Sequence, residues 1–295
     1  MSILEFQNIH RAYKPGVPVL KGVSFAVAAG EVVGLLGRNG AGKTTLIRTA
    51  MGMIHPQQGA VRVFGMDPWE QPVEIKRRVG YVSEEQVLPE RFTVGEVLAL
   101  HRELFRDWDA GMERELMDKF ALSPRAKIRT LSKGQARQVA LLCAVAHRPE
   151  LLILDEPGGG LDPSARREFL ETSIRLLSEG GTTILFSSHY MHDVERMAGR
   201  VVLIDAGEVL LDSALDELRE AYTVAVLPAG APAARVRGLD GCVRVRERAG
   251  GPHAVFRCEP ERLQQLFERE LGIRDAVCTR APLEELFVEL VGAQS

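Results

Sequence analysis

The N-terminal part of the chain alternates between short apolar segments and turns that contain Gly or Pro. Segments 4–13, 19–27 and 59–65 are rich in β-branched and aromatic residues, which predicts strands. An apolar run at 31–37 predicts a buried strand, and the stretch 43–54 that follows its glycine loop predicts a helix. The chain is therefore expected to open with a sheet and then a strand–loop–helix unit.

The middle of the chain, from about residue 88 to 146, has the periodicity of helices. Apolar positions recur at three- and four-residue steps in segment 93–105. Thr93 with Glu96 at its start predicts a capping box, in which each residue satisfies a free backbone N–H of the other. We expect this region to form a helical subdomain.

Apolar segments return after residue 150. Segments 151–157 and 181–189 are almost continuously apolar before their polar ends, which is typical of strands buried in a parallel sheet, and a helix is expected between them. Segment 200–212 predicts a further strand pair.

The composition changes near residue 221. Segment 227–241 is rich in Ala, Gly and Pro and predicts a loop or linker, whereas 242–258 alternates like a hairpin. The segments beyond it predict a helix, a strand and a last helix, in this order: 260–271, 275–280 and 282–292. This pattern indicates a small α+β appendage.

Arg244, Arg246 and Arg248 fall on one face of the predicted hairpin. A solvated strand face is the commoner meaning of such a row, and a binding patch is the alternative. We predict a large first domain at residues 1–220 and an accessory domain at 221–295.

The composition limits the partners and the compartment. The chain has 295 residues, a formal net charge of -3 and a pI near 6.2, so it lacks the basic excess of a nucleic-acid binder, and we expect no nucleic-acid partner. Its four cysteines lack CxxC spacing, which favours free thiols. We see no signal peptide, and the apolar run 139–146 is too short to span a membrane. We therefore expect a soluble cytoplasmic protein.

The segment GRNGAGKT at 37–44 matches G-x-x-x-x-G-K-[ST] and lies between a predicted strand and a predicted helix. Glycines let successive N–H groups point at phosphate oxygens, and the helix dipole favours the same anion. We expect Lys43 to reach the β- and γ-phosphates, Thr44 to ligate Mg²⁺ and Thr45 to bind the α-phosphate. The expected nucleotide-binding residues are Gly37, Arg38, Asn39, Gly40, Ala41, Gly42, Lys43, Thr44 and Thr45. A glycine-rich turn without a ligand is the alternative.

Two carboxylates end the predicted strand at 151–157. Asp155 is placed to hold Mg²⁺ through water, and Glu156 to polarise an attacking water. Acidic residues at the end of a buried strand are weak evidence alone, but the phosphate loop upstream strengthens them. Together the two motifs leave several classes of nucleotide hydrolase open.

The order of the motifs GRNGAGKTT, LSKGQ, LLILDEP, GGGLD and SSH resembles the nucleotide-binding subunit of an ABC transporter, over about residues 4–218. The resemblance implies an α/β P-loop NTPase core with a parallel sheet, an antiparallel N-terminal β subdomain and a helical subdomain at about 88–146. It also implies ATP as the substrate and Mg²⁺ as the cofactor.

In that family two copies bind head to tail, and the LSKGQ-type loop of each copy closes the site of the other. The resemblance therefore assigns Ser132, Gly134 and Gln135 to the γ-phosphate of a second copy's nucleotide. Taken alone, Ser132 is better explained as the N-cap of the helix that follows.

Three more positions take roles from the resemblance. His189 corresponds to the histidine that contacts the γ-phosphate and orients water, and Asp162 to the loop that connects the two sites. Tyr13 corresponds to the aromatic residue that stacks on adenine. A structural histidine and a core tyrosine are the alternatives for two of these positions.

The sequence departs from the family pattern twice. Glu84 stands where the family usually has a glutamine, with Gln86 two places on, and the sequence does not decide which of them senses the nucleotide and its metal. Lys133 replaces the first glycine of the common LSGGQ. We interpret both as variations that leave hydrolysis possible.

The resemblance is to bacterial drug and peptide exporter subunits, which implies a separate transmembrane permease and a place on the inner face of the membrane. The single phosphate loop and the short stretch from Met51 to Leu131 do not fit fused translation factors or coiled-coil repair ATPases. A soluble regulatory ABC ATPase is the alternative, and a small-molecule kinase is less favoured because it leaves LSKGQ and GGGLD unexplained. The transported substrate, its direction and the role of the appendage stay open, as does the resting oligomeric state.

Overall fold

The structure is a computed structural model. It describes residues 2–85, 88–159, 161, 166, 167, 169–173, 181–248 and 250–291, with backbone alone at 288–291. The chain forms two compact units, residues 1–212 and 213–295, so the division falls slightly before the predicted one at residue 220. Within the described part of the chain, no helix is both long and apolar enough to cross a membrane.

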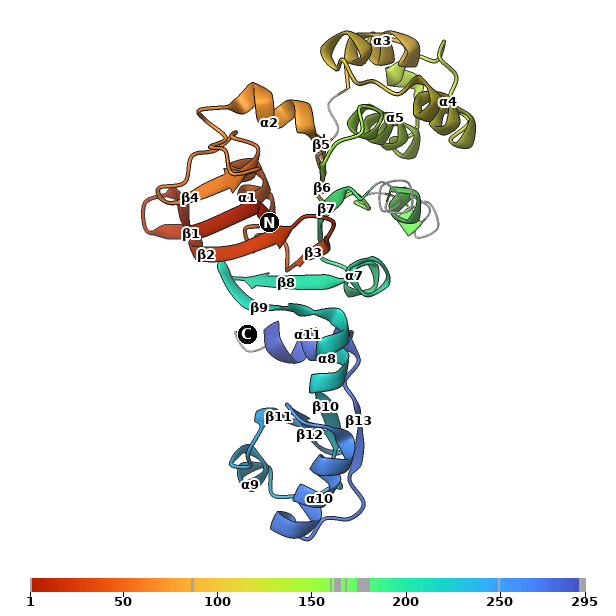
Figure 1. The fold of residues 1–295 in the computed structure, drawn as a ribbon. Helices are drawn as coiled ribbons and strands as arrows, with labels where there is room; N and C mark the ends of the chain where they lie inside the picture. Colours follow the sequence, from red (N-terminus) through yellow and green to blue (C-terminus); the bar gives the residue numbers. More distant parts are fainter. Residues whose placement is uncertain are drawn as a thin grey trace. The chain divides into compact units, whose positions relative to one another are not determined.

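The first unit is built around a six-stranded sheet with the order β5-β6-β7-β3-β8-β9 (Figure 1). Its strands are β3 (Val32–Leu36), β5 (Val79–Val82), β6 (Leu151–Leu154), β7 (Thr183–Ser188), β8 (Arg200–Asp205) and β9 (Glu208–Ala214). The pairs from β5 to β8 are parallel. Every residue of β6 and β7 is buried, so the expectation of buried parallel strands is confirmed.

A second, antiparallel sheet has the order β2-β1-β4. Its strands are β1 (Ser2–Lys14), β2 (Val17–Ala28) and β4 (Gln58–Val63). One hydrophobic core joins the two sheets, with Phe6 and Phe25 in ring contact at 4.9 Å between centroids and Leu46 fully buried beside them. Burial of these side chains fixes the helix after the phosphate loop against both sheets, and the predicted N-terminal sheet is confirmed.

The helices of this unit include a group set apart from the sheets (Figure 1). They are α1 (Lys43–Ala50), α2 (Pro72–Arg78), α3 (Val94–Leu104), α4 (Ala110–Lys119), η1 (Ile128–Thr130), α5 (Lys133–Val145) and α7 (Met191–Met197). Helices α3, α4 and α5 form that group, and α5 joins it to the sheet by packing on β5. The capping box at the start of α3 is confirmed, because Glu96 N donates to Thr93 Oγ1 at 3.2 Å and Thr93 N donates to Glu96 Oε2 at 2.7 Å.

The second unit contains a four-stranded antiparallel sheet with the order β11-β12-β10-β13. Its elements are α8 (Leu215–Ala221), β10 (Thr223–Val226), α9 (Ala233–Arg237), β11 (Cys242–Arg248), β12 (Gly251–Phe256), α10 (Pro260–Leu271), β13 (Val277–Arg280) and α11 (Leu283–Val291). From β10 to β13 the order is β-α-β-β-α-β, which is the ferredoxin-like topology. Its core includes an edge-to-face contact of Phe256 with Phe267.

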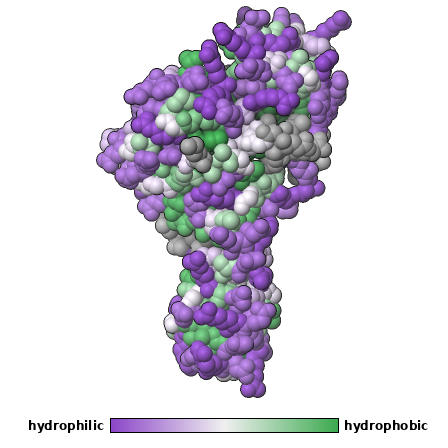
Figure 2. Space-filling model, in the orientation of Figure 1, coloured by the Kyte–Doolittle hydropathy of each residue, from purple (hydrophilic) through white to green (hydrophobic). Residues whose placement is uncertain are grey.

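The expectation of a loop or linker at 227–241 is wrong in part. The segment contains α9, and both Leu227 and Val236 are buried in the core of this unit. A helix of five residues is too short to show periodicity, and the many Ala, Gly and Pro residues conceal it. The predicted hairpin at 242–258 is present as β11 and β12. Hydrophilic side chains dominate the visible surface of each unit (Figure 2).

Candidate functional site

The glycine loop joins the end of β3 to the start of α1, as the sequence predicts. Gly42 is the N-cap of α1 with φ 108°, a left-handed conformation, and no side chain caps the helix. The first N–H groups of α1 therefore have no side-chain acceptor and are available to an anion. Gly37 must also be glycine, because a Cβ there would lie 2.3 Å from the carbonyl oxygen of Ile204. The loop is thus held tightly against β8.

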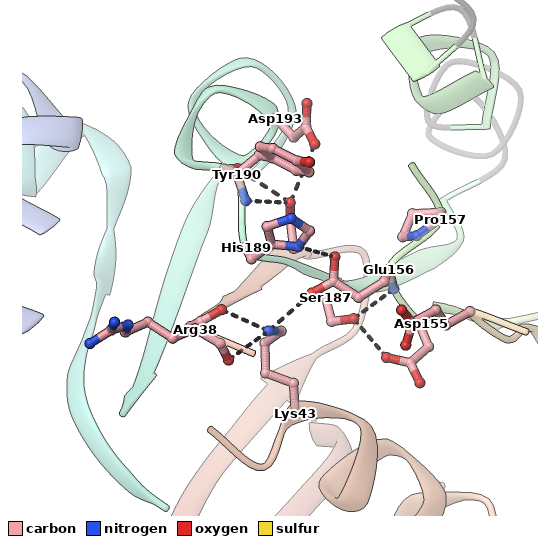
Figure 3. A network of polar contacts seen from close by, with 12 residues as sticks. Arg38, Lys43, Asp155, Glu156, Pro157, Ser187, His189, Tyr190 and Asp193 are labelled. Carbon is pink, nitrogen blue, oxygen red and sulfur yellow. Dashed lines mark hydrogen bonds and ion pairs between the residues drawn. The ribbon is translucent and has the colours of Figure 1, made fainter. Parts of the chain in front are cut away.

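Lys43 is the central cation of the site. Its side chain is 5% exposed, and Nζ donates to the carbonyl oxygens of Gly37 at 2.7 Å and Arg38 at 3.2 Å (Figure 3). It also lies 3.0 Å from Glu156 Oε1, an ion pair that joins the phosphate loop to the end of β6. A phosphate oxygen placed in the loop would compete for the same ammonium group.

Glu156 is held from several sides. Its backbone has φ 45°, which is uncommon for a residue with a side chain, and its N–H donates to Ser187 Oγ at 2.8 Å. Its second carboxylate oxygen, Oε2, lies 2.8 Å from His189 Nδ1 (Figure 3). Lys43, Glu156 and His189 therefore form one continuous polar chain from the phosphate loop to the end of β7.

His189 is itself fixed by its neighbours. The centroid of its ring lies 3.9 Å from that of Tyr190. The guanidinium of Arg166 in turn lies over the Tyr190 ring, 3.7 Å from its centroid. Arg166 also bonds Asp193 Oδ1 through two nitrogens, and Asp193 accepts from Ser188 Oγ at 3.3 Å. These contacts set the direction of the histidine ring toward Glu156.

Asp155 lies beside the phosphate loop at the end of β6. Its Oδ1 accepts from Thr44 Oγ1 at 3.1 Å and from Ser187 Oγ at 2.8 Å, and only 1% of the residue is exposed. Burial raises the pKa of Asp155 above its ordinary value, while the two hydroxyl hydrogen bonds oppose this shift. Two of the three predicted Mg²⁺ ligands, Thr44 and Asp155, are thus in contact. A hard divalent cation suits these oxygen donors and would offset the cost of a buried carboxylate.

The phosphate loop and Glu156 line a hollow of about 430 Å³. It is lined by Tyr13, Val19, Arg38, Asn39, Gly40, Ala41, Gly42, Lys43, Thr44, Thr45, Glu84 and Glu156. Tyr13 is 53% exposed at its edge, and its hydroxyl lies 3.2 Å from Thr45 Oγ1. The tyrosine is therefore not a core residue. Val19, which the sequence analysis did not single out, lines the hollow because β2 pairs with β1.

Glu84 follows β5, is exposed, and lines the hollow. Gln86, the other candidate for the same role in the sequence analysis, lies outside the described residues, as does Asp162. Of the two candidates at this position, Glu84 is the one whose place beside the phosphate loop is described.

The LSKGQ residues stand apart from this hollow. Ser132 is the N-cap of α5 and forms a capping box with Gln135, through bonds of 3.2 Å to Gln135 N and 3.0 Å from Ser132 N. Neither these two residues nor Gly134 lines the hollow. The first turn of α5 therefore lies outside the hollow that the chain's own phosphate loop lines.

The sequence analysis missed two residues that organise the site. Ser187 joins the two neighbouring acidic residues, because its hydroxyl accepts from the backbone N–H of Glu156 and donates to the Asp155 carboxylate. Arg137, in the second turn of α5, is buried and donates to carbonyl oxygens beside the hollow. For Arg137, the available signal was an arginine just before the apolar run 139–146.

Comparisons with known proteins identify relatives of this chain. Residues 20–159 match the family model described as ABC transporter. The ABC transporter ATP-binding protein YtrB of Bacillus subtilis (strain 168) is 29% identical over 99% of both chains. The Nod factor export ATP-binding protein I of Burkholderia orbicola (strain AU 1054) is 32% identical over 99% of this chain and 97% of its own. A solved ATP-binding subunit of an ABC transporter superposes with a TM-score of 0.67 at 33% identity, over 74% of this chain and 92% of that one.

Proposed function

The chain belongs to the family of ABC transporter ATP-binding proteins, an ATPase family, and we propose that it is the subunit that powers a separate membrane exporter. The observation that carries the proposal is the polar chain Lys43–Glu156–His189 beside the Asp155–Thr44 pair, with Lys43, Thr44 and Glu156 lining one hollow. A phosphate cradle, two acidic groups and a histidine are what hydrolysis of a phosphoanhydride requires.

Each group has a defined task in that hydrolysis. Lys43 and the free N–H groups at the start of α1 bind the β- and γ-phosphates. Glu156 takes a proton from a water molecule while the oxygen of that water bonds to the γ-phosphorus. The bond between the γ-phosphorus and the bridging oxygen breaks at the same time, and ADP leaves. His189, bonded to Glu156 Oε2, orients that carboxylate and contacts the γ-phosphate. Tyr13 offers its exposed ring to adenine at the edge of the hollow.

Mg²⁺ fits the oxygen donors at the end of β6. Thr44 and Asp155 are in contact there, and Glu84 lines the same hollow. When bound, the ion neutralises charge on the β- and γ-phosphates. Thr44 would hold it directly, Asp155 through water, and Glu84 would offer a further oxygen donor.

The hollow of one chain lacks the LSKGQ loop, and this supports a site shared between two copies. We propose that two chains associate head to tail around ATP, so that Ser132, Gly134 and Gln135 of each bind the γ-phosphate in the other. Asp162 would lie in the loop that connects the sites. Loss of the γ-phosphate then removes the contact between copies and opens the dimer.

The permease partner and the place on the inner membrane face rest on the relatives. Proteins named for Nod factor export and for daunorubicin and doxorubicin resistance resemble this chain over almost its full length, the latter at 29% identity over 98% of it. We propose an exporter partner for this reason. The transported compound contacts the permease, and this chain does not specify it.

The test is a tagged pull-down of the chain from gently solubilised membranes of its host, with co-purifying proteins identified by mass spectrometry. We expect a multi-span permease in stoichiometric amount, and MgATP hydrolysis by the purified chain. Hydrolysis with only soluble partners would overturn the exporter and favour a soluble regulatory ATPase. No hydrolysis with the permease present would overturn the catalytic assignment.

A further inference from the structure

Arg137 is a buried cation whose partners lie on two other segments. The residue is 8% exposed in the second turn of α5. Its Nη1 donates to the carbonyl oxygens of Glu156, at 3.1 Å, and of Pro157. Its Nη2 donates to the carbonyl oxygen of Glu84 at 2.9 Å. One guanidinium therefore joins α5 to the backbone of the general base and to that of a candidate metal ligand.

This arrangement is costly and specific. Burying a guanidinium against carbonyl oxygens forgoes the ion pair that normally offsets its desolvation. Burial lowers the pKa of Arg137, although the nearby carboxylates of Glu84 and Glu156 oppose the shift. The planar fork of arginine donates from separate nitrogens on opposite sides of the group, whereas a lysine ammonium donates from one nitrogen.

The hydrogen bonds from Arg137 hold a strained part of the backbone. Glu156 has φ 45°, and Arg137 holds both its carbonyl and the next one. The left-handed turn that aims the Glu156 carboxylate is therefore fixed from α5.

The opposite end of α5 is anchored. Helix α5 packs on β5, where Gly80 allows an approach so close that a Cβ would lie 2.2 Å from the carbonyl oxygen of Ala144. Ser132 stands exposed at the free end, one turn before Arg137. A ligand that displaces the free end would thus act on the carbonyl groups that Arg137 holds.

We propose that Arg137 is a positioning residue that couples the LSKGQ loop of a chain to the placement of Glu156 and Glu84 in the same chain. The inference rests on the proposed function. In the head-to-tail dimer, Ser132 binds the nucleotide of the partner, and α5 with Arg137 passes that contact to the hydrolytic groups of its own site. The two sites then hydrolyse ATP cooperatively.

The test uses Arg137→Lys in the full chain, which keeps the charge and removes the fork. The matched control is Arg114→Lys. Arg114 is exposed on α4, and within the described part of the chain its side chain donates only to the carbonyl oxygen of Ala110 in the same helix. We measure the ATP dissociation constant, kcat, the Hill coefficient for ATP and the thermal midpoint. Arg137 does not line the hollow, so the dissociation constant should stay within about twofold. We expect kcat to fall by about tenfold or more, and the Hill coefficient to fall from near 2 to near 1.

The outcomes separate the two proposals. A cooperative wild type with Arg137→Lys equal to Arg114→Lys in kcat and Hill coefficient overturns the positioning role alone. The positioning role is also overturned if the kcat of Arg137→Lys falls only in proportion to the fraction of folded protein while the Hill coefficient stays at the wild-type value. A wild type that neither hydrolyses ATP nor dimerises with it overturns the proposed function instead. If Arg137→Lys does not fold, Arg137→Gln, which retains one planar donor group, takes its place with the same criteria.

Discussion

Replacing Glu156 by Gln is the most informative perturbation of this site. The substitution keeps the shape of the side chain and a hydrogen-bonding oxygen, but removes the proton acceptor. General-base catalysis contributes about 10²- to 10⁴-fold, so kcat should fall by that factor, which equals about 2.7 to 5.4 kcal/mol of transition-state stabilisation. ATP and the contact between copies remain, because neither depends on proton transfer.

The contacts of Glu156 also set an expectation for stability. The carboxylate is 8% exposed and faces Lys43, which is 5% exposed, at 3.0 Å. Removing one partner of a buried pair costs about 3–5 kcal/mol, but Lys43 keeps two carbonyl acceptors here. We therefore expect a loss of about 1.5–3 kcal/mol, the value of a hydrogen bond to a charged group. Phosphate oxygens would replace the lost carboxylate, so MgATP should restore the thermal midpoint.

The assay is light scattering coupled to size-exclusion chromatography, with and without MgATP, together with phosphate release. The expected result is a dimer that persists with ATP and dissociates when ATP is removed, alongside strongly reduced hydrolysis. A Glu156→Gln chain that stays monomeric with saturating MgATP would refute the shared site. One that hydrolyses ATP at the wild-type rate would refute the role of Glu156 as the base.

Three further predictions concern the capping residues, the adenine contact and a buried histidine. Ser132→Ala should remove the α5 cap at a cost of about 1 kcal/mol, and in the Glu156→Gln background it should also abolish the ATP-bound dimer. The control is Thr93→Ala in the same background, which removes the equivalent α3 cap and should leave the dimer intact. Size-exclusion chromatography of the two double variants measures both results. A dimer lost in both, or in neither, contradicts the role of Ser132. Tyr13→Ala should raise the KM for ATP about fivefold to tenfold with little change in kcat, and an unchanged KM excludes ring stacking. Burial lowers the pKa of His147 below its ordinary value of 6.5. Near and below pH 6.5 the native state therefore binds fewer protons than the unfolded state. The free energy of unfolding falls as the pH drops from 6.5 toward the lowered pKa of the native state. Urea midpoints at pH 7.5 and 5.5 should therefore differ less in His147→Leu than in the wild type, and equal differences would contradict the assignment.

Local sequence patterns predicted most of the fold because they act over a few neighbouring residues. The Thr93–Glu96 box lies within one helical turn, and the predicted helix 260–271 coincides with α10. The glycine loop could be placed because strand, loop and helix are contiguous in the chain. By contrast, β10 and α9 went unrecognised, because elements of four and five residues depend on the sheet and core around them.

The sequence by itself determined which groups the site contains: the phosphate cradle up to Thr45, the carboxylates at the end of β6, and the apolar segments that bury the sheet. Only the tertiary structure decided which of these groups touch. The strand order β6-β7-β3 brings Glu156 between Lys43 and His189, and the packing of α5 on β5 places Arg137 against Glu84. The physical reason is that hydrophobic periodicity fixes which face of an element is buried, whereas the neighbour on that face depends on strand order and on the distance at which backbones pack.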